Sequence, residues 1–359
     1  MNKFFFRSLT LGTLVLAGAV ACKKEQEVPV ESAFGYTTVS TLAGNGTSGF
    51  TDGPGAGARF FGPEGVVVDA QGNVYVADAG NSSIRKITPS GTVSTLAGNG
   101  TDGFVNGSLA AARFDLPFDV ALDGQGNLYV ADYGNNCLRK ITPAGVVSTL
   151  AGTGAAGFAD GAGATAQFNG PSGLAIDGQG VIYVSDGDNN RIRKVMPNGT
   201  VSTLAGTGQA GFTDGPGSSA QLSSPQGLAI DAQGTLYITE SGGYRIRKIA
   251  PNGMVSTLAG TGVRGYADGG ANTAQFREVT GVALDAHGDL LVTDADNYCV
   301  RKVTPAGVVS TVAGTRTYGF ADGPARIAQF QPLSGIAVGE KGSLYVTEYG
   351  ERIRKITSN

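Results

Sequence analysis

The sequence Val-Ser-Thr-Leu-Ala-Gly at residues 39–44 recurs six times along the chain, with Leu or Val at its fourth position. The copies follow one another at intervals of 54 residues and begin at Val39, Val93, Val147, Val201, Val255 and Val309. A fixed period of this length indicates one supersecondary unit repeated in tandem, because a single unit cannot bury its apolar surface alone. The chain is therefore predicted to fold as an array of six similar units.

Each unit contains four short runs with the composition of β-strands. In the first complete unit these runs are residues 66–69, 74–77, 84–88 and 93–97, and turn residues separate them. The first two runs are apolar at consecutive positions, which is typical of strands buried on both faces. Each unit is therefore predicted to be a four-stranded antiparallel meander that needs a neighbour on either side.

The longer repeat resembles the NHL family, whose consensus is close to Pro-x-Gly-Val-Ala-Val-Asp-x-x-Gly-Asn-x-Tyr-Val-Ala-Asp-x-Gly-Asn-Asn-Arg-Ile. The matching segments are Pro63 to Asp78, Pro117 to Leu138, Pro171 to Ile192 and Pro225 to Ile246. The resemblance extends from Val39 to the C-terminus and implies an all-β, six-bladed β-propeller with four antiparallel strands per blade. It implies no particular activity, because enzymes, RNA-binding proteins and extracellular sensors share this repeat.

The two ends of the array indicate a closed ring. The array opens with a lone fourth strand at residues 39–43, and it ends after three strands at residues 335–338, 343–347 and 353–356. These segments complete each other's blade, and their pairing removes the exposed sheet edges. An open array would instead need polar caps at both ends. We therefore expect the N-terminal strand to close the last blade.

The N-terminus has the layout of an export signal. Lys3 and Arg7 flank Phe residues, and the apolar run that follows, residues 9–21, is too short to span a bilayer. Residues 19–22, Ala-Val-Ala-Cys, resemble a bacterial lipobox, although Ala19 stands where Leu is commonest. The resemblance implies a signal peptide at 1–21, lipidation of Cys22, a flexible tether at 22–38 and a propeller at 39–359. The alternative is an ordinary signal peptide with a chance cysteine.

Charge and processing together restrict the partners. The chain carries 26 basic and 29 acidic residues, a formal net charge of −3, and a mildly acidic surface argues against binding to a nucleic-acid backbone. We expect a monomer that contacts the membrane through the lipid of Cys22 only. The expected location is secreted, as an outer-membrane or cell-surface lipoprotein of a bacterium.

The topology of a meander separates two kinds of loop onto two faces. The uniform face carries the short turns, such as the Asp-x-x-Gly turn that begins at Asp69 and the Pro-x-Gly turn that begins at Pro89. The crossover face carries links of about 20 residues between units, a length found in functional or disordered loops. Paired anchors such as Phe50 and Phe60 argue against disorder. The crossover face is therefore the expected working face.

Six carboxylates close the second strand of the six units and form a ring. They are Asp78, Asp132, Asp186, Glu240, Asp294 and Glu348. An Arg in the third strand of every unit offers each of them an ion-pair partner: Arg85, Arg139, Arg193, Arg247, Arg301 and Arg354. A collar for a cation is the alternative, and the ion pairs are the favoured interpretation because every unit contains both partners.

Positions that break the repeat near the axis are the candidate site. The residue just before the first strand varies freely among the units, and Asp119 replaces a Gly found in the other five. Arg277-Glu278 replace the segment containing Pro that usually precedes the first strand. The candidate binding residues are Glu64, Phe118, Asp119, Tyr133, Asp188, Gln226, Tyr244, Arg245, Arg277, Glu278, Asp296, Tyr298 and Tyr349. A mixed, Tyr-rich and acidic funnel suits a small ligand or a protein surface. Drift at unconstrained loop positions is the alternative for any single residue.

The inventory of catalytic groups is small. His287 is the only histidine, and it lies in a turn of the uniform face. The NHL-containing amidating lyases hold a zinc ion with several histidines, which one histidine cannot supply, and a Ser/His/Asp triad fails for the same reason. What remains for an enzyme is a hard-cation site at Glu64 and Asp119, resembling six-bladed calcium-dependent lactonases. We expect no cofactor, and Ca²⁺ is the alternative.

Cys137 and Cys299 occupy the same repeat position three units apart. Three blades of six is half a turn, so the two residues should lie on opposite sides of the ring, far beyond the roughly 7 Å Cα separation that a disulfide allows. We therefore predict two free thiols.

These observations favour a non-enzymatic function. We expect a lipid-anchored binding module for a protein or glycan ligand on the crossover face. A divalent-cation-dependent hydrolase or lyase with carboxylates at the channel mouth is the alternative.

Overall fold

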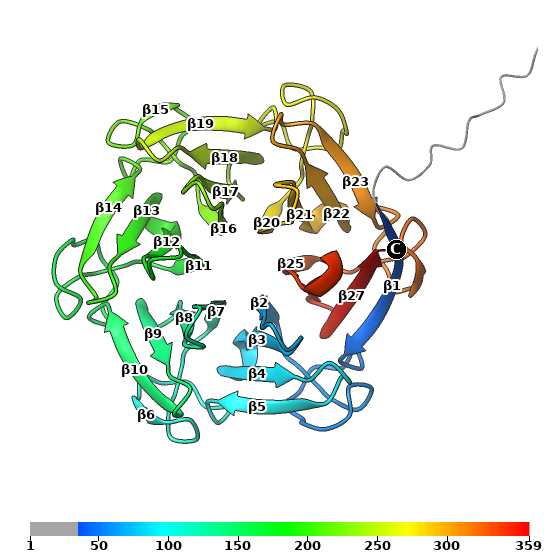
Figure 1. Ribbon diagram of the computed structural model, residues 1–359, viewed down its shortest axis with the longest axis horizontal. Coiled ribbons are helices and arrows are strands. Elements are labelled where there is room, and N and C mark those ends of the chain that lie inside the picture. Colours follow the sequence, from blue (N-terminus) through cyan, green and yellow to red (C-terminus); the bar gives the residue numbers. More distant parts are fainter. Residues whose placement is uncertain (1–34, 359) are drawn as a thin grey trace, which may run out of the picture. The chain divides into compact units, whose positions relative to one another are not determined.

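The repeats fold into six antiparallel sheets that are arranged as blades around a central axis (Figure 1). The computed structural model describes residues 35–358. The signal peptide, Cys22 and most of the predicted tether therefore lie outside the described residues. The all-β propeller predicted from the repeat is confirmed.

Each blade has four main strands, which follow one another from the axis outward. Blade 1 contains β2 Pro63–Val68, β3 Val74–Asp78, β4 Ser83–Ile87 and β5 Val93–Ala97, and blade 2 contains β7 Pro117–Leu122, β8 Leu128–Asp132, β9 Cys137–Ile141 and β10 Val146–Ala151. Blade 3 contains β11 Pro171–Ile176, β12 Ile182–Asp186, β13 Arg191–Val195 and β14 Val201–Ala205, and blade 4 contains β16 Pro225–Ile230, β17 Leu236–Glu240, β18 Arg245–Ile249 and β19 Met254–Ala259. Blade 5 contains β20 Val279–Leu284, β21 Leu290–Asp294, β22 Cys299–Val303 and β23 Val309–Ala313, and blade 6 contains β25 Leu333–Val338, β26 Leu344–Glu348, β27 Arg352–Ser358 and β1 Tyr36–Ala43.

Helix is confined to single 3-10 turns in the described part of the chain. These turns are η1 Ala79–Asn81, η2 Gly187–Asn189, η3 Ala295–Asn297 and η4 Glu340–Gly342. Within residues 35–358, none of the helices has the length and hydropathy of a membrane span.

The N-terminal strand closes the ring as predicted. Strand β1 pairs antiparallel with β27, and Val39 lies opposite Ile356. The pairing begins at Tyr36, opposite Ser358, so residues 36–38 belong to the last blade and not to the tether. Both chain ends are thereby held in one sheet.

The innermost strands begin earlier than the apolar run indicates. The sequence predicts a first strand from residue 66, whereas β2 begins at Pro63, which pairs with Asp78 across an irregularity that ends at Val66. Pro and Gly at positions 63 and 65 are turn signals in isolation. In the ring they form a bulge, because the backbone of the neighbouring blade lies directly against it.

The repeated Arg of the third strand explains most of the repeat. Arg85 is fully buried and donates to Asp78 at 2.6 Å, to Asp52 of the preceding crossover at 2.6 Å, and to the carbonyls of Thr51 and Arg59 at 3.0 Å. Arg139 donates to Asn106 where the other blades have Asp. The Arg–carboxylate pairing predicted for each blade is confirmed in all six.

The aromatic anchors of the crossovers pack on these arginines. The guanidinium of Arg85 lies 4.9 Å from the centroid of the Phe50 ring and 5.0 Å from that of Phe60. Ion pair and cation–π contacts therefore fix each crossover to its blade. Parts of three crossovers also add a short outer strand, namely β6 Gly107–Ser108, β15 Gly215–Pro216 and β24 Gly323–Pro324. These strands cover the outer sheet edge that would otherwise pair with another chain.

The uniform face carries the groups expected there. His287 is exposed in the turn between β20 and β21, where its amide donates to Asp285. Tyr36 lies at the same face, since Asp285 and Asp289 act electrostatically on it. Cys137 and Cys299 are both free and buried in blades 2 and 5, on opposite sides of the ring (Figure 1).

Candidate functional site

The second residue of each innermost strand lies at the axis, at the end of the strand that faces the crossovers. The sequence places these residues just before the strand, whereas they lie inside it. They are Glu64, Phe118, Ser172, Gln226, Thr280 and Ser334.

A ring of glycines lets the innermost strands approach one another. A Cβ at Gly335 would lie 2.6 Å from the carbonyl oxygen of Glu64 and 2.9 Å from the Cα of Gly65. Thr347 bridges the same contact, because its hydroxyl accepts from the amide of Gly335 at 2.7 Å and donates to the carbonyl of Glu64 at 2.6 Å. The backbone of Glu64 is therefore positioned by the neighbouring blade.

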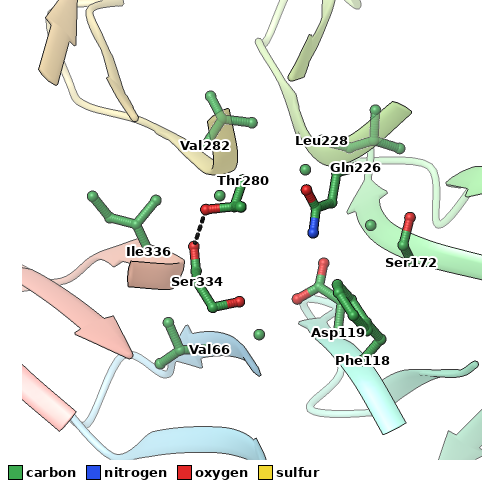
Figure 2. Close-up of a pocket in the computed structure, with 15 residues that line it drawn as sticks. Val66, Phe118, Asp119, Ser172, Gln226, Leu228, Thr280, Val282, Ser334 and Ile336 are labelled. Atoms are coloured by element: carbon green, nitrogen blue, oxygen red, sulfur yellow. Dashed lines mark hydrogen bonds between the residues drawn. The ribbon is translucent and has the colours of Figure 1, made fainter. Parts of the chain in front are cut away.

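Five of the six varied residues line a cavity on the axis, shown in Figure 2. Its empty volume is about 380 Å³, including the open mouth. The ring at the mouth contains the polar residues Asp119, Ser172, Gln226, Thr280 and Ser334, together with the aromatic Phe118. Beneath it, toward the uniform face, the lining is aliphatic: Val66, Leu228, Val282 and Ile336. The cavity is therefore mostly polar at the mouth and aliphatic beneath it.

Glu64 lies beside this cavity and is held by two hydroxyl groups. Its carboxylate accepts from Ser334 and, at 2.5 Å, from the phenol of Tyr349. Burial raises the pKa of Glu64 to about 6, and the nearby Glu278 adds to the shift while the two hydrogen bonds oppose it. Burial, together with the Glu64 charge, also raises the pKa of Tyr349.

Asp119 takes the place of a ring glycine and binds two backbone amides. Its carboxylate accepts from its own neighbour Val120 and from Leu174 of the next blade, both at 2.8 Å. On the other side it lies against Gly65, where a Cβ would come within 2.0 Å of its Oδ1. Burial raises the pKa of Asp119 to about 7, and the Glu64 carboxylate adds to this. The structure thus brings the two predicted carboxylates into electrostatic contact.

Glu64 and Asp119 by themselves would supply too few ligands for a calcium ion, which takes six to eight oxygen ligands. Each carboxylate also accepts two hydrogen bonds from protein donors: Asp119 from two backbone amides, and Glu64 from two hydroxyls. Within residues 35–358, no three His, Cys, Asp or Glu side chains are grouped to hold a metal ion.

An aromatic and aliphatic surface borders the mouth over blades 6, 1 and 2. The rings of Phe118 and Tyr133 lie 5.5 Å apart, and the phenol of Tyr133 donates to the exposed Asp188 at 3.4 Å. Phe61, Leu116 and Tyr349 expose 50%, 47% and 46% of their surface. Sequence reasoning missed Phe61 and Leu116. The sequence contains one signal that could have found Leu116, because this residue occupies the repeat position at which blades 1 and 3 have Gly62 and Gly170.

Leu116 combines exposure with a strained backbone. Its φ is +48°, in the left-handed region that glycine adopts in the equivalent positions of blades 1 and 3. A Leu there costs of order 1 kcal/mol. The side chain is 47% exposed, so little apolar burial within the blade offsets this strain. Leu116 is therefore a candidate contact for a ligand.

A second, polar cavity lies over blades 4 and 5. The predicted residues Tyr244, Arg277 and Glu278 line it together with Arg264, which sequence reasoning missed. Asp296 lies 2.5 Å from Arg264 and 3.6 Å from Arg277.

Tyr298 and Arg245, two of the predicted residues that line neither of these cavities, make contacts elsewhere. Tyr298 packs edge-on against Tyr318, with ring centroids 5.6 Å apart. Arg245 lies over the ring of Phe212 at 4.2 Å and donates to the carbonyls of Gly243 and Thr261. Arg245 therefore anchors a crossover, as Arg191 does on Phe158.

A family model described as "NHL repeat" matches residues 60–87, 114–141 and 168–195, which are equivalent parts of the first three blades. The chain is an NHL-repeat six-bladed propeller. The chain spans about a quarter of the length of one curated relative and about an eighth of another. Protein SUPPRESSOR OF QUENCHING 1, chloroplastic, from Arabidopsis thaliana is 31% identical over 73% of this chain and 27% of its own length. Teneurin-3 from Mus musculus is 28% identical over 89% of this chain and 13% of its own.

Solved structures similar to the NHL propeller have diverse functions. An auxiliary nutrient binding protein from Bacteroides thetaiotaomicron superimposes with a TM-score of 0.69 at 17% identity, covering 89% of this chain and 76% of the other. A gluconolactonase from Xanthomonas campestris gives 0.60 at 16% identity, covering 90% of each chain. Streptogramin B lyase gives 0.54 at 14%, covering 91% and 99%. At these identities the likeness shows the fold alone.

Proposed function

We propose that this NHL propeller is a recognition module that binds a protein or glycan ligand at the mouth of its axis on the crossover face. The observation that supports it best is the break in sixfold symmetry at the mouth. Exposed apolar side chains border one half, and charged and hydroxyl groups line the other. Such a surface offers contact area and hydrogen-bonding specificity together.

The course of the chain would present this face outward. Strand β1 starts at the uniform face, where Tyr36 is near Asp285, and it ends at the crossover face. Tyr36, the first residue of β1, therefore lies on the side opposite the mouth. We propose that Cys22 is lipidated and that the crossover face points away from the membrane of a bacterial outer surface. Two structural neighbours are auxiliary nutrient binding proteins, which agrees with a binding role.

The proposal is tested with a glycan array and a pull-down from membrane and culture fractions. The full chain with Cys22→Ser is the bait. The rim variant carries the two further substitutions Tyr133→Ala and Leu116→Gly together. The matched control is His287→Ala on the uniform face. We expect the rim variant to lose at least about tenfold in affinity, because aromatic contacts contribute about 1 kcal/mol or more. Equal binding by the rim and uniform-face variants would overturn the proposal.

The competing function is a cation-dependent hydrolase or lyase, and the gluconolactonase neighbour favours it. Calcium titration followed by thermal melting separates the two. A stoichiometric, stabilising ion whose effect disappears in Glu64→Ala would support the enzyme. The protein donors already bound to Glu64 and Asp119 lead us to expect no saturable stabilisation.

The anchor is tested by mass spectrometry of the mature N-terminus. We expect a chain that begins at Cys22 and carries the mass of a lipid, and a Cys22→Ser chain without that mass. A mature chain that begins elsewhere, or an unmodified Cys22, would contradict the lipoprotein assignment.

A further inference from the structure

Blade 5 carries charged side chains at positions where the other blades have none of that kind. Arg264 and Arg277 stand where no other blade has a basic residue, and Glu278 stands where the others have Gly, Leu, Gly, Ser and Pro. The fold does not require these charges, because the ion pair that every blade shares is made separately, by the buried Arg301. An exposed pair such as that of Arg264 with Asp296 contributes little to stability. The needs of the blade therefore do not account for these residues.

These side chains line the polar cavity over blades 4 and 5, which are neighbours in the ring (Figure 1). Its empty volume is about 690 Å³, including its open side, which lies within the roughly 300–1,000 Å³ typical of small-molecule sites. Ser224, Ser241 and Tyr244 add hydroxyl groups to the lining. The side chains of Arg264 and Arg277 are 50% and 45% exposed. The cavity therefore has the size and the polarity of a site for a small polar ligand.

Several polar groups of this cavity are free to bind a ligand. The carboxylate of Glu278 receives no hydrogen bond from the described residues, and its oxygens are not sealed from solvent. Arg264 and Arg277 each use only part of their guanidinium group on Asp296. An arginine has five N–H donors, and a carboxylate can accept about four hydrogen bonds. Both donors and acceptors therefore remain available.

The charges of the cavity balance one another. The guanidinium groups of Arg264 and Arg277 are matched by the carboxylates of Glu278 and Asp296. Burial raises the pKa of Glu278, the Asp296 carboxylate adds to the rise, and the Arg264 guanidinium opposes it. An anionic ligand would be repelled by the two carboxylates, and a cationic ligand by the two arginines. A neutral ligand rich in hydroxyl groups avoids both penalties, because each hydroxyl donates and accepts hydrogen bonds.

We infer that the cavity over blades 4 and 5 binds a neutral saccharide, whose adjacent hydroxyl groups donate to the Glu278 carboxylate and accept from Arg264 and Arg277. Planar guanidinium and carboxylate groups suit adjacent hydroxyls because they present two hydrogen-bonding sites side by side. Tyr244 offers an aromatic surface for the apolar C–H face of a sugar ring. The inference rests on the proposed binding function, and it selects a glycan over a protein as the ligand.

The first experiment asks whether sugars bind and where they bind. The full chain with Cys22→Ser is screened on an array of neutral glycans, and with glucose, galactose, mannose and their disaccharides by ligand-observed NMR. We expect at least one neutral saccharide to bind, and Glu278→Gln and Arg277→Gln each to weaken it about tenfold, since hydrogen bonds to charged groups are the stronger ones. Thermal melting checks that each variant is folded.

The matched control is Arg326→Gln. Arg326 is also an exposed arginine, but it follows β24 at the outer edge of blade 6. This substitution changes the net charge of the protein by the same amount as Arg277→Gln, and it should leave the affinity for the saccharide unchanged.

A second readout separates direct contact from a structural effect. Glu278→Gln leaves the cavity with a net positive charge, and Arg277→Gln leaves it with a net negative charge. For the sugar that binds, the affinity of the uronic acid relative to the neutral form should rise at least about threefold in Glu278→Gln. The relative affinity of the amino sugar should rise by a similar factor in Arg277→Gln. A variant that only disturbed the cavity would weaken all three forms alike.

Failure to find any saccharide that either cavity variant weakens would overturn the inference, as would an equal loss of all three forms in both variants. Capture of a protein that the same two variants release would also overturn it, in favour of a protein ligand. If sugars fail while the rim variant with Tyr133→Ala and Leu116→Gly still loses its ligand, the recognition face stands and only the saccharide assignment falls. If no ligand depends on the crossover face, both proposals fall.

Discussion

The carboxylate of Asp78 and the guanidinium of Arg85 form a 2.6 Å ion pair in which both side chains are fully buried. The same pair recurs in every blade, and the second carboxylate on Arg85, that of Asp52, belongs to the crossover. The pair therefore joins the middle of a blade to the loop that carries the working face. It explains why every blade has Arg in its third strand and an acid at the end of its second strand, and why the crossovers of five blades carry an Asp.

Removing one partner should destabilise the propeller strongly. Arg85→Ala leaves Asp78 buried without its counter-ion and removes the group between Phe50 and Phe60. We expect the free energy of unfolding in urea to fall by about 3–5 kcal/mol. Arg264→Ala, which breaks an exposed pair with Asp296, is the control and should cost less than about 1 kcal/mol. Equal losses in both variants would contradict the structural role.

Stability should depend on pH through Glu64. Burial raises the pKa of Glu64 to about 6, above its usual value of 4.5, so the folded state holds the proton more tightly than the unfolded state. This contribution is complete below about pH 4.5 and is lost as the pH rises through about 6. The melting temperature of wild type relative to Glu64→Gln should therefore fall between about pH 4.5 and about pH 7.5. Parallel pH curves for wild type and Glu64→Gln would refute the assignment.

Closure of the ring should be sensitive to one side chain of β1. Val39 is 1% exposed and packs in the cluster that includes Phe330, Leu344 and Ile356. Val39→Ala should lower the free energy of unfolding by about 2 kcal/mol. Ser40→Ala, on the exposed side of the same strand, should change it by less than about 0.5 kcal/mol. An unchanged free energy of unfolding in Val39→Ala would mean that β1 contributes little to the stability of the last blade.

The two thiols of the propeller should be inert until the chain unfolds. Burial raises the pKa of both Cys137 and Cys299, and neither is exposed. In the Cys22→Ser chain, a thiol reagent should react slowly with the native protein and titrate two groups after unfolding without reductant. Titration of none would indicate a disulfide and would contradict the half-turn separation of the two blades.

The repeat made much of the fold predictable, because the features that every blade needs recur in the sequence. The closing strand, the buried ion pairs, the exposed His287 and the free thiols all followed from counting positions. The start of the innermost strands did not, because Pro63 and Gly65 read locally as a turn. Their extended pairing depends on the backbone of the neighbouring blade, which a local pattern does not contain.

The site was predictable only in outline. Positions that break the repeat led to Glu64 and Asp119, which the ring brings into electrostatic contact. The same criterion included Arg245, which anchors a crossover, and omitted Arg264, whose position in the crossover varies among the blades. The partners of Glu64, Ser334 and Tyr349, come from the blade farthest along the chain, so no spacing rule could pair them.

The position of β1 in the last blade constrains the order in which the molecule can assemble. Thr37 contacts Thr357, 320 residues later, so the first strand to leave the ribosome finds its partner only when the last one has been made. Until then, blade 6 lacks its outer strand and the earliest segment stays unpaired, which delays folding by a long loop closure.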